Sequence, residues 1–262
     1  MEIRSDFVKY PRTPHLAGSG IQRGDEEMDT VPFAVLRGLH LVVTEKMDGA
    51  NCGISFAPDG TPRLQSRGHY LTGGGRERQF DRLKAWTGTH AAALYAALTD
   101  RYILYGEWLY AKHTTFYTRL PDYFLAFDCY DHQTGMFLAT PTRAALLAAV
   151  PFVRSVRVAH AGPLVSPETL PRLVGPSPFV GADAAVRLRA ACAARGLDAE
   201  RVLAESDLSG AMEGVAVKVE ANGVVQARYK YVRPGFRQTL DASGSHWASR
   251  PIIANELEGG KR

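Results

Sequence analysis

Three short turns, each joining two runs of apolar and β-branched residues, constrain the fold of this chain most. They lie at residues 57–60, 131–135 and 220–223, and each of them ends in glycine. Glycine, with asparagine or aspartate nearby, supplies the backbone conformations that tight hairpins require, and hairpins build antiparallel sheets. The pattern therefore predicts an α+β fold with antiparallel sheets, without the regular strand–helix alternation of a parallel sheet.

The hydrophobic periodicity predicts where the other elements lie. We expect strands at 41–45, 51–57, 62–66, 101–110, 123–130, 136–139, 156–160, 213–219 and 224–232. We expect helices at about 77–86, 89–99, 142–150, 182–195 and 198–205. The last two helices follow a proline-rich stretch, and we interpret about 181–207 as a peripheral helical insertion.

Composition and length indicate one soluble, globular domain. The chain has 262 residues, of which 45% are hydrophobic and 22% are charged, which is enough for one good-sized core. No linker forces a boundary, so we expect a single domain over 1–262. It would comprise a lead-in at 1–40, a core at 41–236 and a short C-terminal extension at 237–262.

Charge and cysteine usage narrow the class of protein only loosely. The net charge of +4 permits a polyanionic partner without requiring one. Three widely spaced cysteines favour neither a disulfide framework nor a zinc site, which suits a reducing compartment. The charged N-terminus is unlike a signal peptide, and no run approaches the roughly 20 apolar residues of a membrane span. We therefore predict a cytoplasmic protein that does not associate with membranes.

The segment Glu45-Lys46-Met47-Asp48-Gly49, with Asn51 after it, lies between two predicted strands. A lysine on a sharp turn at a strand end can reach a bound nucleotide, and the glycine lets the backbone come close. Taken alone, a pattern this short is more typical of an ordinary surface turn with a solvated lysine. Its significance depends on the residues that follow it along the chain.

Three later positions combine polar or aromatic side chains with strand ends. Arg67 follows the first hairpin and could bind a phosphate, although an arginine there is more often solvated. Glu107 lies in an apolar strand, where a carboxylate needs a partner or forms a buried ion pair. Phe127 closes another strand and offers either a core ring or a stacking surface for a base.

The last two predicted strands carry further charges. Glu213 opens one strand, and Val215 continues the face on which Glu213 lies. Lys218 lies an odd number of residues after Glu213, so on an unbroken strand we expect it to lie on the opposite face. Arg228 and Lys230 share one face of the final strand. Two neighbouring cations repel each other unless an anion such as a triphosphate lies between them.

The ordered motifs K-x-D-G, S-R-G, Y-G-E, F-D, E-G-V-x-V-K and R-x-K resemble those of the covalent nucleotidyltransferase superfamily, which contains ATP-dependent ligases and mRNA capping enzymes. The set is most similar to the second type of phage RNA ligase and to short bacterial RNA ligases. The resemblance implies an antiparallel-sheet, ATP-grasp-like adenylyltransferase domain with peripheral helices. It also implies RNA repair chemistry, in which AMP passes from ATP to a lysine and then to a 5′-phosphate, before a 3′-hydroxyl seals the strands.

The resemblance assigns expected roles to the residues of this chain. Lys46 would be the nucleophile, and Arg228 and Lys230 would be the catalytic cations. Glu213 and Asp48 would orient Mg²⁺ or Mn²⁺, mostly through waters. The ATP pocket would be formed by Glu45, Lys46, Asn51, Arg67, Glu107, Phe127, Val215, Lys218, Arg228 and Lys230. In this set Glu45 would read the adenine edge, Glu107 would bind the ribose, Phe127 would stack on adenine and Arg67 would bind phosphate.

A lysine with an ordinary pKa near 10.4 is protonated at neutral pH and cannot attack phosphorus. We therefore expect Arg228, Lys230 and the metal to lower the pKa of Lys46. The same charges would stabilise the negative oxygens around the reacting phosphorus.

The chain departs from the family pattern in two respects. Arginine stands at position 228, where the family more often has lysine, and arginine cannot take part in proton transfer. The stretch after Lys230 is too short for the five-stranded OB-fold of DNA ligases and capping enzymes. A DNA nick ligase, a GTP-using capping enzyme and an inactive nucleotide- or RNA-binding module are the alternatives. The RNA substrate would carry 5′-phosphate and 3′-hydroxyl ends, and a protein partner that processes ends or binds RNA is compatible with this view.

Overall fold

The computed structural model describes residues 7–21, 25, 27–236 and 251–260. Parts of the expected lead-in (1–6, 22–24 and 26) and of the C-terminal extension (237–250 and 261–262) lie outside the described residues. None of the helices in the described ranges is long and apolar enough to cross a membrane.

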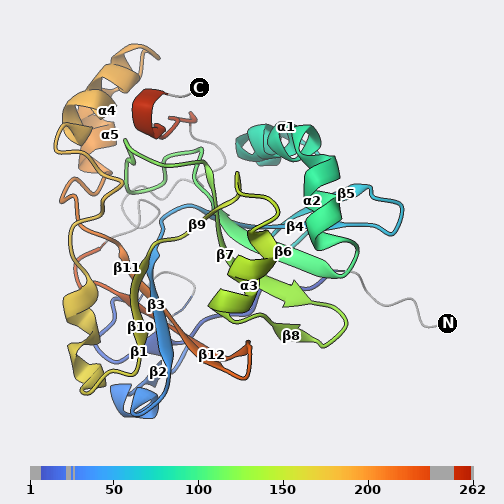
Figure 1. Ribbon diagram of the computed structural model, residues 1–262. Helices are drawn as coiled ribbons and strands as arrows, with labels where there is room; N and C mark the ends of the chain where they lie inside the picture. Colours follow the sequence, from blue (N-terminus) through green and yellow to red (C-terminus); the bar gives the residue numbers. More distant parts are fainter. Residues whose placement is uncertain (1–6, 22–24, 26, 237–250, 261–262) are drawn as a thin grey trace.

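Two open sheets form the body of the molecule (Figure 1). The first has the strand order β10-β3-β11-β12-β1-β2. Its strands are β10 (Val158–Gly162), β3 (Leu41–Lys46), β11 (Gly214–Ala221), β12 (Val224–Val232), β1 (His15–Leu16) and β2 (Thr30–Val31). One face of this sheet is buried against the two 3₁₀ helices η1 (Phe33–Leu36) and η3 (Pro167–Leu173), through a cluster that includes Leu36 and Leu170.

The second sheet has the strand order β5-β4-β6-β7-β8, and β9 pairs with β7. Its strands are β5 (Pro62–Ser66), β4 (Ala50–Phe56), β6 (Tyr102–Trp108), β7 (Phe124–Asp131), β8 (Met136–Phe137) and β9 (Arg154–Ser155). The helices on this side are η2 (Gly75–Phe80), α1 (Asp81–Thr89), α2 (Ala91–Leu98) and α3 (Thr140–Leu147). They cover its outer face and contribute Leu83, Leu94 and Leu98 to the largest hydrophobic cluster.

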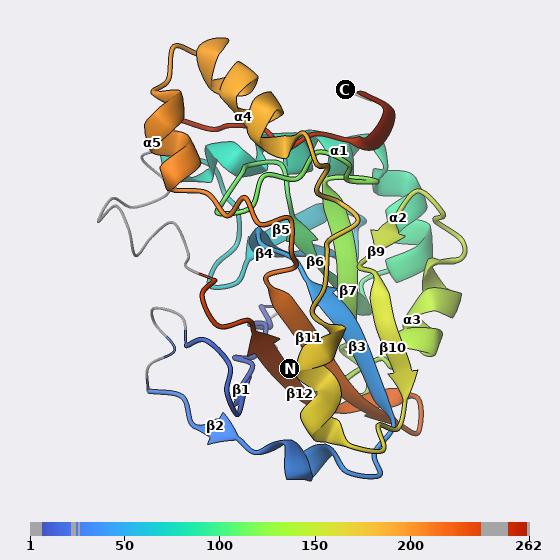
Figure 2. The same ribbon diagram turned by 90° about the vertical axis from the view of Figure 1, so that its left-hand side faces the viewer.

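The chain crosses from the first sheet to the second at the predicted lysine turn, because β3 ends at Lys46 and β4 begins at Ala50. The helices α4 (Ala184–Ala193) and α5 (Ala199–Ala204) lie to one side of both sheets, close to the C-terminal segment with η5 (Glu258–Gly260) (Figures 1 and 2). Leu188 and Cys192 of α4 pack there against Phe116 and Ile253.

The expected α+β class with antiparallel sheets is confirmed, and within the described residues neither sheet closes into a barrel. Each predicted strand and helix has a counterpart in the structure. The sequence gives no sign of β1, β2 and β9, since two-residue strands are too short to show a period of two. These three strands also make the parallel pairings between named strands within the described residues.

A β-bulge in β6 and β7 shapes the second sheet where it approaches the lysine turn. The register shifts between Tyr105 and Gly106, which leaves Phe127 without a paired residue on β6. A Cβ atom at Gly106 would lie 2.4 Å from the ring of Phe124 and 2.9 Å from the carbonyl oxygen of Leu125. The close approach of β7 at the bulge therefore requires glycine.

We expect Gly106→Ala to lower the free energy of unfolding by about 1–3 kcal/mol, because the added methyl group overpacks this contact. The matched control is Gly88→Ala in α1, where a Cβ would meet no atom within 4 Å. Alanine favours a helix over glycine by about 1 kcal/mol, so this control should be neutral or stabilising. Chemical denaturation of both variants measures the difference, and equal effects would contradict the assignment.

Candidate active site

The turn between β3 and β4 holds Lys46 in a fixed position. Met47 is buried beside Tyr117, and the backbone N–H of Asp48 donates a hydrogen bond of 2.9 Å to the Tyr117 hydroxyl. A Cβ atom at Gly49 would lie 2.7 Å from the carbonyl oxygen of Trp108. Glycine is therefore needed here because β6 runs directly against the turn.

Lys46 forms an ion pair with Glu213, with a distance of 2.6 Å from Nζ to Oε1. The lysine side chain is 23% exposed and the carboxylate is fully buried, so the lysine is the partner of this pair that solvent reaches. Burial acts to lower the pKa of Lys46, but the negative charges of Glu213, Glu107 and Asp48 outweigh it and raise this pKa above its ordinary value. Arg228 and Lys230 alone therefore do not lower the pKa of Lys46, and the expected lowering stays a prediction for the protein with a bound metal.

Two further carboxylates lie close to this ion pair. Asp48 Oδ2 accepts hydrogen bonds from the backbone N–H groups of Thr114 and Thr115, both at 2.7 Å. Glu107 Oε1 accepts one from the Gly49 N–H at 3.1 Å, and Asn51 lies opposite Glu107 in the β4–β6 register. Burial raises the pKa of Glu107 to about 8, and the charges of Glu213 and Asp48 add to the shift against the opposing charge of Lys46.

Lys230 lies on the same face of the first sheet and is paired with an acid that the sequence analysis missed. Its Nζ contacts Asp25 Oδ2, and His15 Nε2 lies 3.3 Å from the same oxygen. His15 is fully buried, pairs with Lys230 in the register of β1 and β12, and contacts Ser19 Oγ through Nδ1 at 2.7 Å. Burial lowers the pKa of Lys230, and the positive charge of Lys46 acts in the same direction, against the bond to Asp25.

Arg228 and Lys218 converge on Asp128 instead of on Lys46. Arg228 Nε donates to Asp128 Oδ2 at 2.8 Å, and Lys218 Nζ contacts Asp128 Oδ1 at 3.2 Å. Lys218 also donates to the carbonyl oxygen of Phe127 at 3.0 Å. The ring of Phe127 meets Tyr10 edge-on at 5.2 Å, and the Tyr10 hydroxyl donates to Asp128.

The strand register corrects two expectations about the direction of side chains. Lys218 pairs with Arg228 on β12 and with Val42 on β3, so it faces the side of Lys46 and Lys230. Val215 pairs with Glu45 and packs in the core on the opposite face, so its side chain is not directed toward Lys46. Glu213 does not follow this alternation of faces, because it precedes the first residue of β11.

Glu45 and Arg67 lie at the margins of the site. The Glu45 carboxylate is buried and accepts hydrogen bonds from Ser177 Oγ at 2.5 Å and from Arg157 Nε at 3.2 Å. These bonds anchor the strand that carries Lys46. Arg67 is exposed, and its Nη2 donates to the carbonyl oxygen of Pro11 at 3.3 Å. The structure thus brings Lys46, Asp48, Glu107, Glu213 and Lys230 together and places the remaining predicted residues around them.

In the part of the chain that the structure describes, no group of three or more histidine, cysteine, aspartate or glutamate side chains is arranged to hold a metal ion. Three carboxylates, those of Asp48, Glu107 and Glu213, nevertheless act on one lysine. Oxygen ligands that leave most coordination positions to water suit Mg²⁺ or Mn²⁺.

The pKa of Glu107 predicts a pH dependence of stability. Its pKa of about 8 in the folded protein exceeds the ordinary value of 4.5, so the folded state holds this proton more tightly than the unfolded state does. Ionisation of Glu107 therefore lowers the free energy of unfolding progressively as the pH rises from 4.5 to about 8, and by a constant amount at higher pH. We expect Glu107→Gln to raise the melting temperature, relative to wild type, more at about pH 9 than at about pH 5. Thermal unfolding followed by circular dichroism tests this, and an equal difference at both pH values would contradict it.

Comparison with known proteins places this geometry in a family. The sequence profile of the RNA ligase family matches residues 39–232, which include all the predicted site residues. No match to a curated protein was found. Among solved structures, a variant of the Naegleria gruberi RNA ligase with AMP and Mn superposes with a TM-score of 0.52 at 13% identity, over 87% of this chain and 56% of that chain.

A second variant of the Naegleria gruberi RNA ligase, with ATP and Mn, superposes with a TM-score of 0.52 at 15% identity, over 92% of this chain and 60% of that chain. The chain therefore spans less than two thirds of the length of these ligases, and at such identities the likeness shows the fold alone. The family match covers most of the sequence and includes all of the second sheet and the strands β10, β3, β11 and β12 of the first. The chain belongs to the RNA ligase family.

Proposed function

We propose that this protein is an ATP-dependent RNA ligase that joins 5′-phosphate and 3′-hydroxyl RNA ends through an AMP adduct on Lys46. The observation that carries the proposal is the position of Lys46. Lys46 is the partly exposed member of an ion pair with a buried Glu213, at a turn fixed by Gly49 between two sheets. Membership of the RNA ligase family supports it, as do the ATP, AMP and Mn in the complexes of the Naegleria gruberi enzyme.

In the first step, the Nζ atom of Lys46 attacks the α-phosphorus of ATP. A nitrogen–phosphorus bond forms, and the bond from that phosphorus to the pyrophosphate oxygen breaks. The amine must first lose a proton, which its carboxylate neighbours oppose because they raise the pKa of Lys46. The charge of these carboxylates must therefore be neutralised when the nucleotide binds.

Glu213 and Asp48 are the residues that we propose to hold Mg²⁺ or Mn²⁺, mostly through waters. The bound ion would neutralise the carboxylates and stabilise negative charge on the phosphate oxygens. Two backbone N–H groups already orient Asp48, and burial holds Glu213. These contacts fix the carboxylates before any ligand arrives.

Lys230 and Arg228 supply positive charge on the same face of the sheet. Lys230 is near enough to Lys46 for the charge of Lys46 to lower the pKa of Lys230, so an anion that lies between the two amines would be stabilised by both. Arg228 Nη2 is buried and makes no hydrogen bond within the described residues, which leaves a donor for the nucleotide. We assign both residues to the phosphate groups of ATP.

The remaining predicted contacts form the nucleoside pocket in this proposal. Phe127 would stack on adenine, Glu107 would accept from a ribose hydroxyl, and Asn51 lies beside Glu107. Lys218 would act through Phe127 and Asp128, which it already binds, instead of through a phosphate. Glu45 would contribute its backbone to the reading of adenine, since its side chain is engaged, and Arg67 would bind phosphate at the margin.

In the later steps, AMP passes to the 5′-phosphate of an RNA strand, and a 3′-hydroxyl then displaces AMP and closes the phosphodiester bond. We propose RNA repair as the biological role and residues 41–236 as the catalytic core of one domain. The cytoplasmic location and a partner that processes ends or binds RNA stay predictions from the sequence.

Incubation with α-labelled ATP and a divalent metal should give a covalent protein–AMP adduct on wild-type protein. Lys46→Ala should abolish the adduct because the nucleophile is lost. The matched control is Lys84→Ala, which removes another partly exposed lysine ion-paired with a glutamate and should leave the adduct intact. Gel electrophoresis and mass spectrometry of the labelled peptide measure both results.

Two outcomes would contradict the proposal. Labelling by GTP in place of ATP would indicate capping chemistry, and the absence of an adduct with either nucleotide would exclude covalent nucleotidyl transfer. A panel of nicked, bridged and single-stranded RNA with 5′-phosphate ends then identifies the substrate that is sealed.

A further inference from the structure

The C-terminal segment 253–258 is bound along its length to the loop that follows β6. The Lys112 N–H donates to the carbonyl oxygen of Ile253 at 2.7 Å, and the Glu256 N–H donates to that of Tyr117 at 2.9 Å. The Leu120 N–H donates to the carbonyl oxygen of Glu256 at 3.0 Å. The segment is remote in sequence from this loop but is joined to it by main-chain hydrogen bonds like those of a strand pair.

Asn255 makes the central contacts of this segment and is 1% exposed. Its Oδ1 atom accepts a hydrogen bond from the Tyr117 N–H at 2.9 Å, and its Nδ2 atom donates to the carbonyl oxygen of Leu109 at 2.7 Å. Its backbone N–H donates to the carbonyl oxygen of Tyr110 at 2.9 Å. One buried side chain therefore spans the loop from its start to its middle.

The same loop holds the turn that carries Lys46. The N–H groups of Thr114 and Thr115 bind Asp48 Oδ2, and the Tyr117 hydroxyl accepts from the Asp48 N–H. Tyr117 also packs with Met47 and with Leu257 of the C-terminal segment in one buried cluster. Three of the contacts that fix the lysine turn thus come from a loop that Asn255 ties together.

We infer that Asn255 is a positioning residue for Lys46, which acts through Tyr117 and through the amides of Thr114 and Thr115. The expected effect of Asn255 on activity rests on the proposed function, whereas its expected effect on the order of the loop does not. A misplacement of about 1 Å at a reacting group can reduce a rate about 100-fold, so a support of this kind matters even at a distance from the chemistry.

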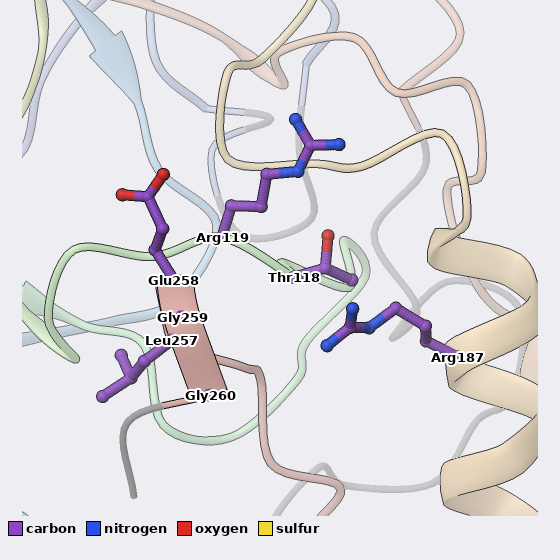
Figure 3. Close-up of a pocket in the computed structure, with 7 residues that line it drawn as sticks. All are labelled: Thr118, Arg119, Arg187, Leu257, Glu258, Gly259 and Gly260. Carbon is purple, nitrogen blue, oxygen red and sulfur yellow. The ribbon is translucent and has the colours of Figure 1, made fainter.

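The outer side of the contact between the C-terminal segment and this loop supplies a control. A cavity of about 500 Å³ opens there, lined by Thr118, Arg119, Arg187 and residues 257–260 (Figure 3). Arg119 lies in the loop, but its side chain is exposed and takes part in none of the contacts to Asn255 or Asp48 described above. Arg119→Ala changes the same loop without removing the support.

The first measurement is amide hydrogen exchange, which does not depend on activity. In Asn255→Ala, exchange over residues 47–49 and 109–120 should be faster than in wild type, while Arg119→Ala should match wild type. Unchanged exchange in Asn255→Ala would overturn the inference, whatever the protein catalyses.

The second measurement separates the lysine step from the sealing step. At saturating ATP, Asn255→Ala should form the AMP adduct at least about tenfold more slowly than wild type. Sealing of RNA that is already adenylylated does not use Lys46 as nucleophile and should fall far less. An equal fall in both steps would indicate a general loss of structure and would overturn the inference.

Tyr117→Phe provides a milder variant if Asn255→Ala fails to fold. It removes the hydroxyl that accepts from the Asp48 N–H but keeps the ring in its buried cluster. The same selective loss of adduct formation is expected, and wild-type rates would overturn the inference. If wild-type protein itself forms no adduct, the proposed function fails, and the exchange experiment still decides the structural part.

Discussion

The ion pair between Lys46 and Glu213 is the interaction on which the site depends. It joins the last residue of β3 to the residue just before β11, at the point where the chain leaves one sheet for the other. Because Glu213 is fully buried, loss of Lys46 would remove the cation paired with this carboxylate in a region of low dielectric, which is costly. The packing of Met47 and the glycine at position 49 keep the lysine within reach of that carboxylate. The remaining residues of the site are arranged around this ion pair.

Much of the fold could be predicted because the hairpin turns and the strand periods are local signals. The face of β11 on which Lys218 lies could not be predicted. Glu213 lies before the first residue of this strand, so the number of residues between Glu213 and Lys218 does not show whether they share a face. Asp25 was missed for a different reason. The sequence around it has no periodicity, and Asp25 meets Lys230 beside His15, whose parallel pairing with Lys230 the sequence did not indicate. The raised pKa of Lys46 was also out of reach, because it depends on three carboxylates from separate segments.

The C-terminal segment illustrates the same limit. Nothing in the sequence around Asn255 indicates that its amide spans a loop more than a hundred residues earlier in the chain, because both hydrogen bonds are formed to backbone groups. Nearly every residue type has the same backbone donor and acceptor, so the sequence does not show which backbone groups a side chain will contact. Motifs that supply the chemistry are therefore recognisable, whereas the contacts that hold those motifs in place become visible only in three dimensions.

The pairing of charges in the site has a consequence for how a nucleotide enters it. Lys46, Lys230 and Arg228 each already contact a carboxylate, from Glu213, Asp25 and Asp128 respectively. Under the proposed function, a polyphosphate that binds with a divalent cation would take over these cationic groups, and the cation would compensate the charge of the carboxylates that they leave. Few counterions are released in such an exchange, so affinity for the metal–nucleotide complex should vary little with ionic strength. A bare polyphosphate would have to compete with the protein's own carboxylates, so a site of this kind would favour the metal–nucleotide complex over the bare nucleotide.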